Sequence, residues 1–217
     1  MPIAELRGRD GAWTLSGGYM LSWYRALATQ LGLELQFVVR PRRRLESALD
    51  AGEADLLCRV RPDWVSAPLR TRLRWFHEPF LEVVDQLVAG PGVELPASLE
   101  ALEGVRVGTV LGFRYPALQA QFDQGTLRRD DALNEGQLAE KLLRGHDAFA
   151  MMDLARLHFV QQGSARGAQL RPTGLGLSRQ PAFCALAPGS RLDAPPLEAA
   201  QAALLRSAAM RRLLQGF

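Results

Sequence analysis

Apolar residues recur at helical spacing in several stretches of the chain, and short apolar runs separate these stretches. Residues 16–32 give the first clear helical pattern, with two glycines near its start and Gly32 at its C-terminal end. Residues 33–39 alternate between apolar and polar side chains and predict a strand. Residues 43–55 predict a second helix and residues 55–60 a buried strand, so this part of the chain alternates strands with helices.

A second series of strands and helices follows a connection rich in glycine and proline at residues 90–104. Alternation of this kind is typical of α/β folds with parallel strands and right-handed crossovers. We find no internal repeat and no low-complexity segment, and the pattern predicts two α/β units, each with its own sheet. After the connection we expect a strand and turn at 105–112, helices at 115–125 and 134–145, a strand ending at Asp153, a helix at 154–163, a strand at 182–190 and an amphipathic helix at 196–217.

Composition and charge narrow the class of protein. The chain has 217 residues and a formal net charge of +3, which is too small to indicate a nucleic-acid-binding surface. Only Lys141 among the 26 basic residues is a lysine, a bias that we attribute to GC-rich coding rather than to function. No apolar run is long enough to cross a bilayer, and residues 1–13 contain no signal-peptide core. We therefore expect either a cytoplasmic protein or an exported one whose signal has been removed.

Five segments of the chain occur in an order that resembles a known family. They read GGYMLSWYRALATQLGLELQFV, LESALDAGEADLL, PLRTRLRWFHEPF, SLEALEGVRVGTVLGFRY and LAEKLLRGHDAFAMMDLARLHFV. Their order and spacing are similar to those of the family 3 solute-binding proteins, the periplasmic amino-acid-binding components of ABC importers. The resemblance covers nearly the whole chain, although each motif is weak alone.

The resemblance implies the α/β fold of type II periplasmic binding proteins, with two lobes joined by two crossovers. Lobe one would hold residues 1–88 and 182–217, and lobe two residues 89–181. The ligand would bind between the lobes, at the carboxyl ends of the strands, and hinge closure would enclose it. The protein would then be periplasmic, with its export signal removed from this chain.

Two charged residues match positions that bind the amino acid in that family. Arg70 stands where the family arginine binds the α-carboxylate, a task that suits a planar guanidinium with two parallel donors. Asp153 stands where the family aspartate receives the ammonium group. The alternatives are a solvated arginine and a helix N-cap, which aspartate also favours. We expect Arg72 and Arg74 to be solvated or packed over Trp75.

The second lobe departs from the family pattern after its first strand. Gly112, Phe113, Arg114 and Tyr115 stand where amino-acid binders usually carry Gly-Thr. We expect this turn to open a helix, whose backbone N–H groups suit an anion. Arg114 would add a cation suited to a dicarboxylate or another anionic ligand, or it would point to solvent. The departure weakens the case for a plain amino-acid ligand.

Four further residues are candidates for the ligand pocket. Trp64 and Arg59 belong to a loop region that is longer than in the family, and Trp13 and Tyr19 flank the first strand-to-helix turn. Packing or surface exposure is at least as good an interpretation for all four.

The cysteines and histidines give no catalytic or metal-binding pattern. Cys58 and Cys184 fall on predicted strands of the same lobe, and we expect free buried thiols, with a disulfide as the alternative in an oxidising compartment. The histidines are scattered, without a paired nucleophile or metal ligand. We expect no cofactor and no metal.

These features favour a monomeric, non-enzymatic binder of a small anionic or zwitterionic solute that carries a carboxylate. Its expected partner is an ABC importer permease or a membrane sensor, and no nucleic acid. One alternative is a periplasmic enzyme resembling cyclohexadienyl dehydratase, in which Asp153 acts as general acid. Another is the effector domain of a regulator, although the chain shows no helix-turn-helix pattern.

Overall fold

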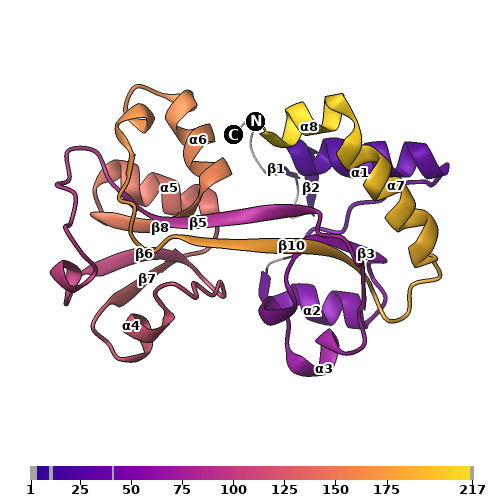
Figure 1. The fold of residues 1–217 in the computed structure, drawn as a ribbon, viewed down its shortest axis with the longest axis horizontal. Helices are drawn as coiled ribbons and strands as arrows, with labels where there is room; N and C mark the ends of the chain where they lie inside the picture. Colours follow the sequence, from indigo (N-terminus) through magenta and orange to yellow (C-terminus); the bar gives the residue numbers. More distant parts are fainter. Residues whose placement is uncertain (1–3, 10–11, 41, 216–217) are drawn as a thin grey trace. The chain divides into compact units, whose positions relative to one another are not determined.

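The chain folds into two compact units in a computed structural model that describes residues 4–9, 12–40 and 42–215 (Figure 1). Unit 1 comprises Met1–Glu82 and Pro181–Phe217, and unit 2 comprises Val83–Gln180. The chain passes from one unit to the other within β5 (Leu81–Ala89) and again within β10 (Ser178–Leu186), which are neighbours in the strand order. The lobe boundaries expected from the sequence, after residues 88 and 181, fall within the same two strands.

Unit 1 combines helices with a small antiparallel sheet. In this unit β10 pairs with β3 and with β4, and β1 pairs with β2 as a separate hairpin. The single C-terminal helix expected from the sequence is two helices, separated at Ser207. The elements of the unit are β1 (Glu5–Arg9), β2 (Ala12–Gly17), α1 (Tyr19–Leu31), α2 (Arg42–Asp50), β3 (Leu56–Val60), η1 (Pro62–Trp64), α3 (Ala67–Arg70), β4 (Arg74–Trp75), α7 (Ala194–Arg206) and α8 (Ala208–Gln215).

Helix α1 confirms the first helical pattern of the sequence. Gly32 ends it in the left-handed conformation, with φ of 64°, and its N–H caps the last carbonyls. On the buried face, the ring of Trp23 lies 4.4 Å from that of Phe80, the residue before β5. This contact ties the helix to the segment that leads out of unit 1.

The prediction of a strand at residues 33–39 is wrong. The segment is extended, but within the described parts of the chain it belongs to no ladder and its backbone makes no hydrogen bond to another strand. Alternating side chains give a segment the shape of a strand, whereas a ladder also needs a neighbour with free backbone groups. Leu35, Phe37 and Val39 are half-buried nevertheless.

The expectation of free thiols is also wrong, because Cys58 and Cys184 form a disulfide with an S–S distance of 2.03 Å. The two residues face each other across β3 and β10, as their positions on strands of one lobe suggested. The register shifts next to them, so that Arg59 is the extra residue of a β-bulge and has a φ of 60°. A left-handed conformation is costly for arginine, and such strain persists only where the surrounding structure fixes it.

Tyr24 of α1 forms a hydrogen bond with β3, the strand that carries Cys58. Its hydroxyl oxygen accepts a hydrogen bond of 2.9 Å from the Cys58 N–H, which the β10 ladder leaves available. Burial raises the pKa of Tyr24 to about 12, although the hydrogen bond from Cys58 opposes the shift. The hydroxyl thus satisfies a buried donor and stays protonated.

We expect Tyr24→Phe to lower the free energy of unfolding of unit 1 by about 1–3 kcal/mol, because it leaves the Cys58 N–H without an acceptor. In the parent protein, Tyr24 is protonated in the folded state, and its contribution to the free energy of unfolding is fully present below pH 10. This contribution is lost as the pH rises toward 12, because the unfolded chain loses the tyrosine proton at a lower pH than the folded protein does. The variant should lose less stability over that range. Urea titrations at pH 8 and pH 11, followed by tryptophan fluorescence, test both points, since all four tryptophans lie in unit 1. Equal alkaline sensitivity of parent and variant would contradict the assignment.

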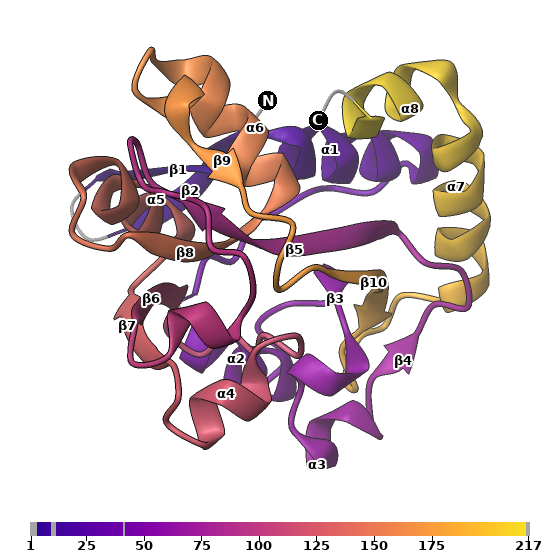
Figure 2. The same ribbon diagram turned by 60° about the vertical axis from the view of Figure 1, so that its left-hand side comes forward.

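Unit 2 is built around a mixed sheet with helices packed against it (Figure 2). Strand β6 runs parallel to β7 and β8, and β5 runs antiparallel to β8 and to the short β9. Strand β7 was not expected from the sequence, and the helix expected at 115–125 is shorter and begins only at Gln119. The elements are η2 (Glu100–Leu102), β6 (Arg106–Val110), α4 (Gln119–Asp123), β7 (Arg128–Ala132), α5 (Glu135–Arg144), β8 (Phe149–Asp153), α6 (Leu154–Gly163), η3 (Gly167–Gln169) and β9 (Arg171–Pro172).

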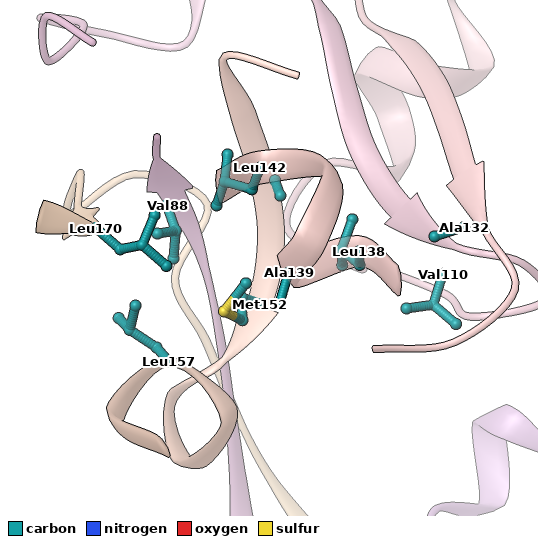
Figure 3. Close-up of a cluster of buried hydrophobic side chains, with 10 residues drawn as sticks. Val88, Val110, Ala132, Leu138, Ala139, Leu142, Met152, Leu157 and Leu170 are labelled. Atoms are coloured by element: carbon teal, nitrogen blue, oxygen red, sulfur yellow. The ribbon is translucent and has the colours of Figure 1, made fainter. Parts of the chain in front are cut away.

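A cluster of apolar side chains joins the helices of unit 2 to its sheet (Figure 3). Leu138 and Leu142 of α5 and Leu157 of α6 pack with Val110 and Met152 from the strands, and all are almost fully buried. Burying a leucine side chain contributes roughly 1.5–3 kcal/mol. This cluster holds the carboxyl ends of β6 and β8 in place, and the candidate site lies there.

Candidate functional site

Asp153 ends strand β8 and caps helix α6. Its Oδ1 accepts hydrogen bonds from the N–H groups of Ala155 at 2.9 Å and Arg156 at 3.3 Å. The residue is only 7% exposed. The expected N-cap role is therefore confirmed. Its expected role as a ligand residue stays a prediction, since a carboxylate has lone pairs beyond those used for capping.

Further charged side chains gather around Asp153 at this edge of unit 2. Asp85 of β5 lies directly opposite Asp153 in the antiparallel register. Glu135, at the start of α5, forms an ion pair of 3.4 Å with Arg156. Three carboxylates and one guanidinium thus line one small concavity, together with Tyr115 and Phe113.

This concavity is small, and part of its lining is apolar. Val110, Leu138 and Met152, which belong to the buried cluster of unit 2, form part of its lining. Its free volume of about 10 Å³ is roughly room for one water molecule. Its lining holds three carboxylates and one guanidinium, a set that suits an ammonium group better than a second carboxylate.

The turn after β6 differs from what the sequence predicted. Gly112 is left-handed with φ of 81°, as a tight turn requires, but no helix starts there, because α4 begins seven residues later, at Gln119. The proposed anion site on helical N–H groups is therefore wrong. Arg114 is exposed. Phe113 is half-buried against the core, and its N–H donates to the Val110 carbonyl.

Tyr115 is a core residue rather than a bulky group at the surface. It is 3% exposed, its hydroxyl accepts a hydrogen bond of 3.0 Å from the Val110 N–H, and burial raises its pKa. Arg129 of β7 lies over its ring and donates to the carbonyls of Val110 and Phe113. Arg129 thereby fixes the turn that forms one side of the concavity.

In unit 1, Arg70 is the last residue of α3. It is exposed, and its guanidinium forms no ion pair with another described residue. Its two neighbours in the motif differ from it. Arg72 pairs with Asp50 at 2.6 Å, and Arg74 donates to the carbonyls of Ser190 and Leu192; both arginines are exposed, which agrees with the expectation of solvated side chains.

The remaining candidates of unit 1 lie in several environments. Trp64 ends the short helix η1, is half-buried and lies under the Arg61 guanidinium at 5.6 Å. Arg59 occupies the β-bulge. Tyr19 begins α1 and is 2% exposed, which agrees with the packing interpretation. Trp13 lies in β2 opposite Gly8.

Sequence reasoning missed Asp85, Glu135, Arg129 and Arg156. Asp85 lies within an apolar strand, where a lone aspartate was a signal that could have been used. The others became significant only through strand register and helix packing. Within the described ranges, no group of His, Cys, Asp or Glu residues could hold a metal ion, and no helix has the length and apolar content needed to cross a membrane.

Comparisons with known proteins identify the fold. No family model matches the chain, and no curated protein matches it. Solved structures do match. The substrate-binding protein of an amino acid ABC transporter from Streptococcus pneumoniae, bound to L-arginine, has a TM-score of 0.72 at 16% identity, over 99% of this chain and 89% of that one.

Two other solved structures have the same architecture. A histidine kinase sensor domain with similarity to periplasmic binding proteins matches with a TM-score of 0.72 at 19% identity, over 96% of this chain and 88% of that one. An ancestral amino-acid-binding protein, a precursor of cyclohexadienyl dehydratase, matches with a TM-score of 0.76 at 14% identity, over 99% and 89%. The chain therefore has the two-lobed α/β fold of type II periplasmic binding proteins, as the sequence predicted.

Proposed function

We propose that this protein is an extracytoplasmic binding protein that captures an amino acid by closure of its two units. The observation that carries the proposal is the gathering of Asp85, Glu135 and Asp153 around one small concavity at the strand ends of unit 2. An ammonium group would bind there. The α-carboxylate of the same ligand would bind Arg70, an exposed guanidinium without an ion pair among the described residues.

The charges favour a zwitterion over a dicarboxylate as the ligand. Arg156 is already paired with Glu135, and it is the one cationic side chain among the residues that line the concavity. A second ligand carboxylate placed here would meet Asp85 and Asp153. The structural relative from S. pneumoniae, which binds L-arginine, has a ligand of the favoured kind.

Partner and location belong to the same proposal. Delivery to an ABC importer and presentation to a membrane sensor are both compatible with the fold, since relatives of each kind share it. The protein would act as a monomer outside the cytoplasm. The Cys58–Cys184 disulfide supports this location, because structural disulfides persist in oxidising compartments.

We favour binding over catalysis because Asp153 already has a structural role, since its Oδ1 accepts hydrogen bonds from two backbone N–H groups of the helix that it caps. The dehydratase precursor among the structural relatives is itself described as an amino-acid-binding protein. Turnover of prephenate or arogenate by the purified protein would reverse this ranking.

Calorimetry on protein stripped of ligand by unfolding and refolding tests the proposal. L-Arginine, L-glutamine and other amino acids are compared with succinate, which has two carboxylates and no amine. We expect at least one amino acid to bind well below millimolar and succinate not to bind. Failure of every amino acid, or binding of succinate alone, would overturn the assignment of the ligand class.

Substitutions of Asp153 separate its two roles. We expect Asp153→Asn to keep the cap, since asparagine is an equally good N-cap, while affinity for the amino acid falls about tenfold or more through loss of charge. Asp153→Ala should lose affinity and also about 1 kcal/mol of stability. Circular dichroism melts and calorimetry measure the two effects. An Asn variant with unchanged affinity would restrict Asp153 to capping.

A further inference from the structure

The turn that borders the concavity of unit 2 is held by side chains rather than by a helix. Residues 110–115 follow from β6, and Val110, Phe113 and Tyr115 of this turn belong to the lining. Helix α4 begins only at Gln119, so it does not take up the backbone groups of the turn. Backbone carbonyls that leave water need partners, and those of Val110 and Phe113 find theirs on β7, which ends the strand order.

Arg129 of β7 supplies these partners. Its Nη1 donates to the Phe113 carbonyl and its Nη2 to the Val110 carbonyl, both at 3.1 Å. Asp131, two residues further along the same face of the strand, accepts from Nε at 3.2 Å and from Nη2 at 2.8 Å. All the nitrogens of one planar group are therefore engaged at once. A lysine, with a single ammonium on a flexible stem, cannot make this set of bonds.

Other contacts within unit 2 hold the guanidinium in place. The Asp131 carboxylate also accepts a hydrogen bond of 2.7 Å from the hydroxyl of Thr109, a fully buried residue of β6. The Arg129 guanidinium lies over the rings of Tyr115 and Phe122, at 5.6 and 5.5 Å from their centroids. The sheet and the two rings thus fix the position from which Arg129 reaches the turn.

Protection of a sheet edge would also explain the charges of β7, but it accounts for less. Charged residues on an edge strand oppose pairing with other chains, and that task requires no bonds to a turn. The two faces of β7 also have separate partners. Asp130 pairs with Lys141 of α5 at 2.6 Å, whereas Arg129 and Asp131 serve the turn. The polar sequence of this strand therefore has a more specific use.

Phe113 is the lining residue whose place depends most on these bonds. Leu138 and Met152 of the lining are almost fully buried in the apolar cluster of unit 2, so core packing fixes them (Figure 3). Phe113 is only half-buried, and Arg129 holds the turn that carries it. With the turn in this position the free volume is about 10 Å³, roughly that of one water molecule.

A primary ammonium group is close to water in size and brings three N–H donors to the carboxylates of Asp85, Glu135 and Asp153. A methyl group on the same nitrogen would need space that the concavity lacks, and it would replace one of the donors. The carboxylate that faces the methyl group would lose a partner, which weakens binding further. In this form the concavity suits a primary amine and not a secondary one.

We propose that Arg129 is a positioning residue that sets the selectivity of this site for a primary ammonium group. It acts through residues 110–115, which it holds against the concavity, and not by binding the ligand itself. The protein then takes amino acids with a free α-amine and rejects their Nα-methyl derivatives. This inference rests on the amino-acid site proposed above and adds to it the residue that determines its size.

Calorimetry tests the inference by comparing each amino acid that binds, L-arginine and L-glutamine first, with its Nα-methyl derivative. We expect the parent protein to bind the derivative at least about tenfold more weakly. In Arg129→Lys we expect this ratio to fall below about threefold, because the turn can move away from the concavity. A parent protein that binds both forms equally would overturn the inference and leave the proposed function intact. Absence of binding by every amino acid of the panel would overturn both.

Two further variants separate selectivity from stability, which circular dichroism melts report. Arg128→Lys changes the exposed arginine beside Arg129 and should alter neither the ratio nor the melting temperature. Phe113→Ala enlarges the concavity without a change at Arg129 and should narrow the ratio, so the test does not depend on how well Arg129→Lys folds. If Arg129→Lys lowers only the melting temperature, and both it and Phe113→Ala keep the ratio of the parent, the proposal is overturned and Arg129 is a structural residue alone.

Discussion

Removing the Cys58–Cys184 disulfide is expected to cost unit 1 about 3 kcal/mol of stability, and it is the largest structural effect that we predict. The bond spans a sequence separation of 126 residues, and the loop that it closes contains all of unit 2. Loop-closure entropy for loops this long corresponds to about 4–5 kcal/mol, and measured values are usually about 2–4 kcal/mol. The disulfide holds together the two chain segments that make up unit 1, whatever unit 2 does.

The double variant Cys58→Ala/Cys184→Ala measures this effect without a reactive thiol. Urea unfolding followed by tryptophan fluorescence reports on unit 1 alone, because Trp13, Trp23, Trp64 and Trp75 all lie there. Dithiothreitol should shift the midpoint of the parent protein toward that of the variant and leave the variant unchanged. A parent protein whose midpoint is insensitive to dithiothreitol, with free thiols on mass spectrometry, would show that the bond does not form.

The disulfide also bears on Arg59. The bulge that holds this arginine at φ of 60° lies immediately beside the bonded pair, so the covalent link helps to keep a costly backbone conformation in place. If Arg59 contributes to the ligand pocket, as the sequence analysis suggested, its orientation depends on that link. Loss of the disulfide should then weaken amino-acid binding as well as stability.

Most of the fold could be predicted from the sequence because its signals are local. Helix α1 with its glycine stop, helix α5 between Asn134 and Gly145, and the buried strand β8 each carry their periodicity and their caps within a dozen residues. Strand β7 was missed because its sequence, Arg-Arg-Asp-Asp-Ala, looks like a polar loop. Its pairing with β6 comes from a neighbour far along the chain, which no local pattern reveals.

The candidate site was only partly predictable for the same physical reason. Asp153 could be identified because it follows a buried strand and precedes a helix. Asp85 lies beside Asp153 only because of the register of β5 against β8. Arg129 belongs to the site because it donates hydrogen bonds to the carbonyls of residues 110 and 113. The four residues from Gly112 to Tyr115 resemble a helix start, because a glycine follows a strand there, but α4 begins only at Gln119. The aromatic residue Tyr115 instead completes the core.

Substitution of Arg70 by alanine is expected to lower amino-acid affinity at least about thirtyfold. Removing one partner of a desolvated charge pair costs about 2–5 kcal/mol, much of it from the charge left unpaired. Arg70→Lys should fall between parent and alanine, because an ammonium keeps the charge but cannot bond both carboxylate oxygens in a fork. Stability should change little, since Arg70 is exposed and has no ion pair among the described residues.

Arg72→Ala is the matched control, because it removes an exposed arginine two residues away that pairs with Asp50. A surface ion pair contributes about 0–1 kcal/mol to stability, and its loss should leave affinity unchanged. The α-carboxamide of the tightest-binding amino acid supplies the second control, since it keeps the ammonium group and lacks the carboxylate charge. If Arg70 binds that carboxylate, Arg70→Ala should weaken binding of the amino acid far more than binding of its carboxamide. Equal losses for the two ligands would place the carboxylate elsewhere and leave Arg70 as a solvated surface residue.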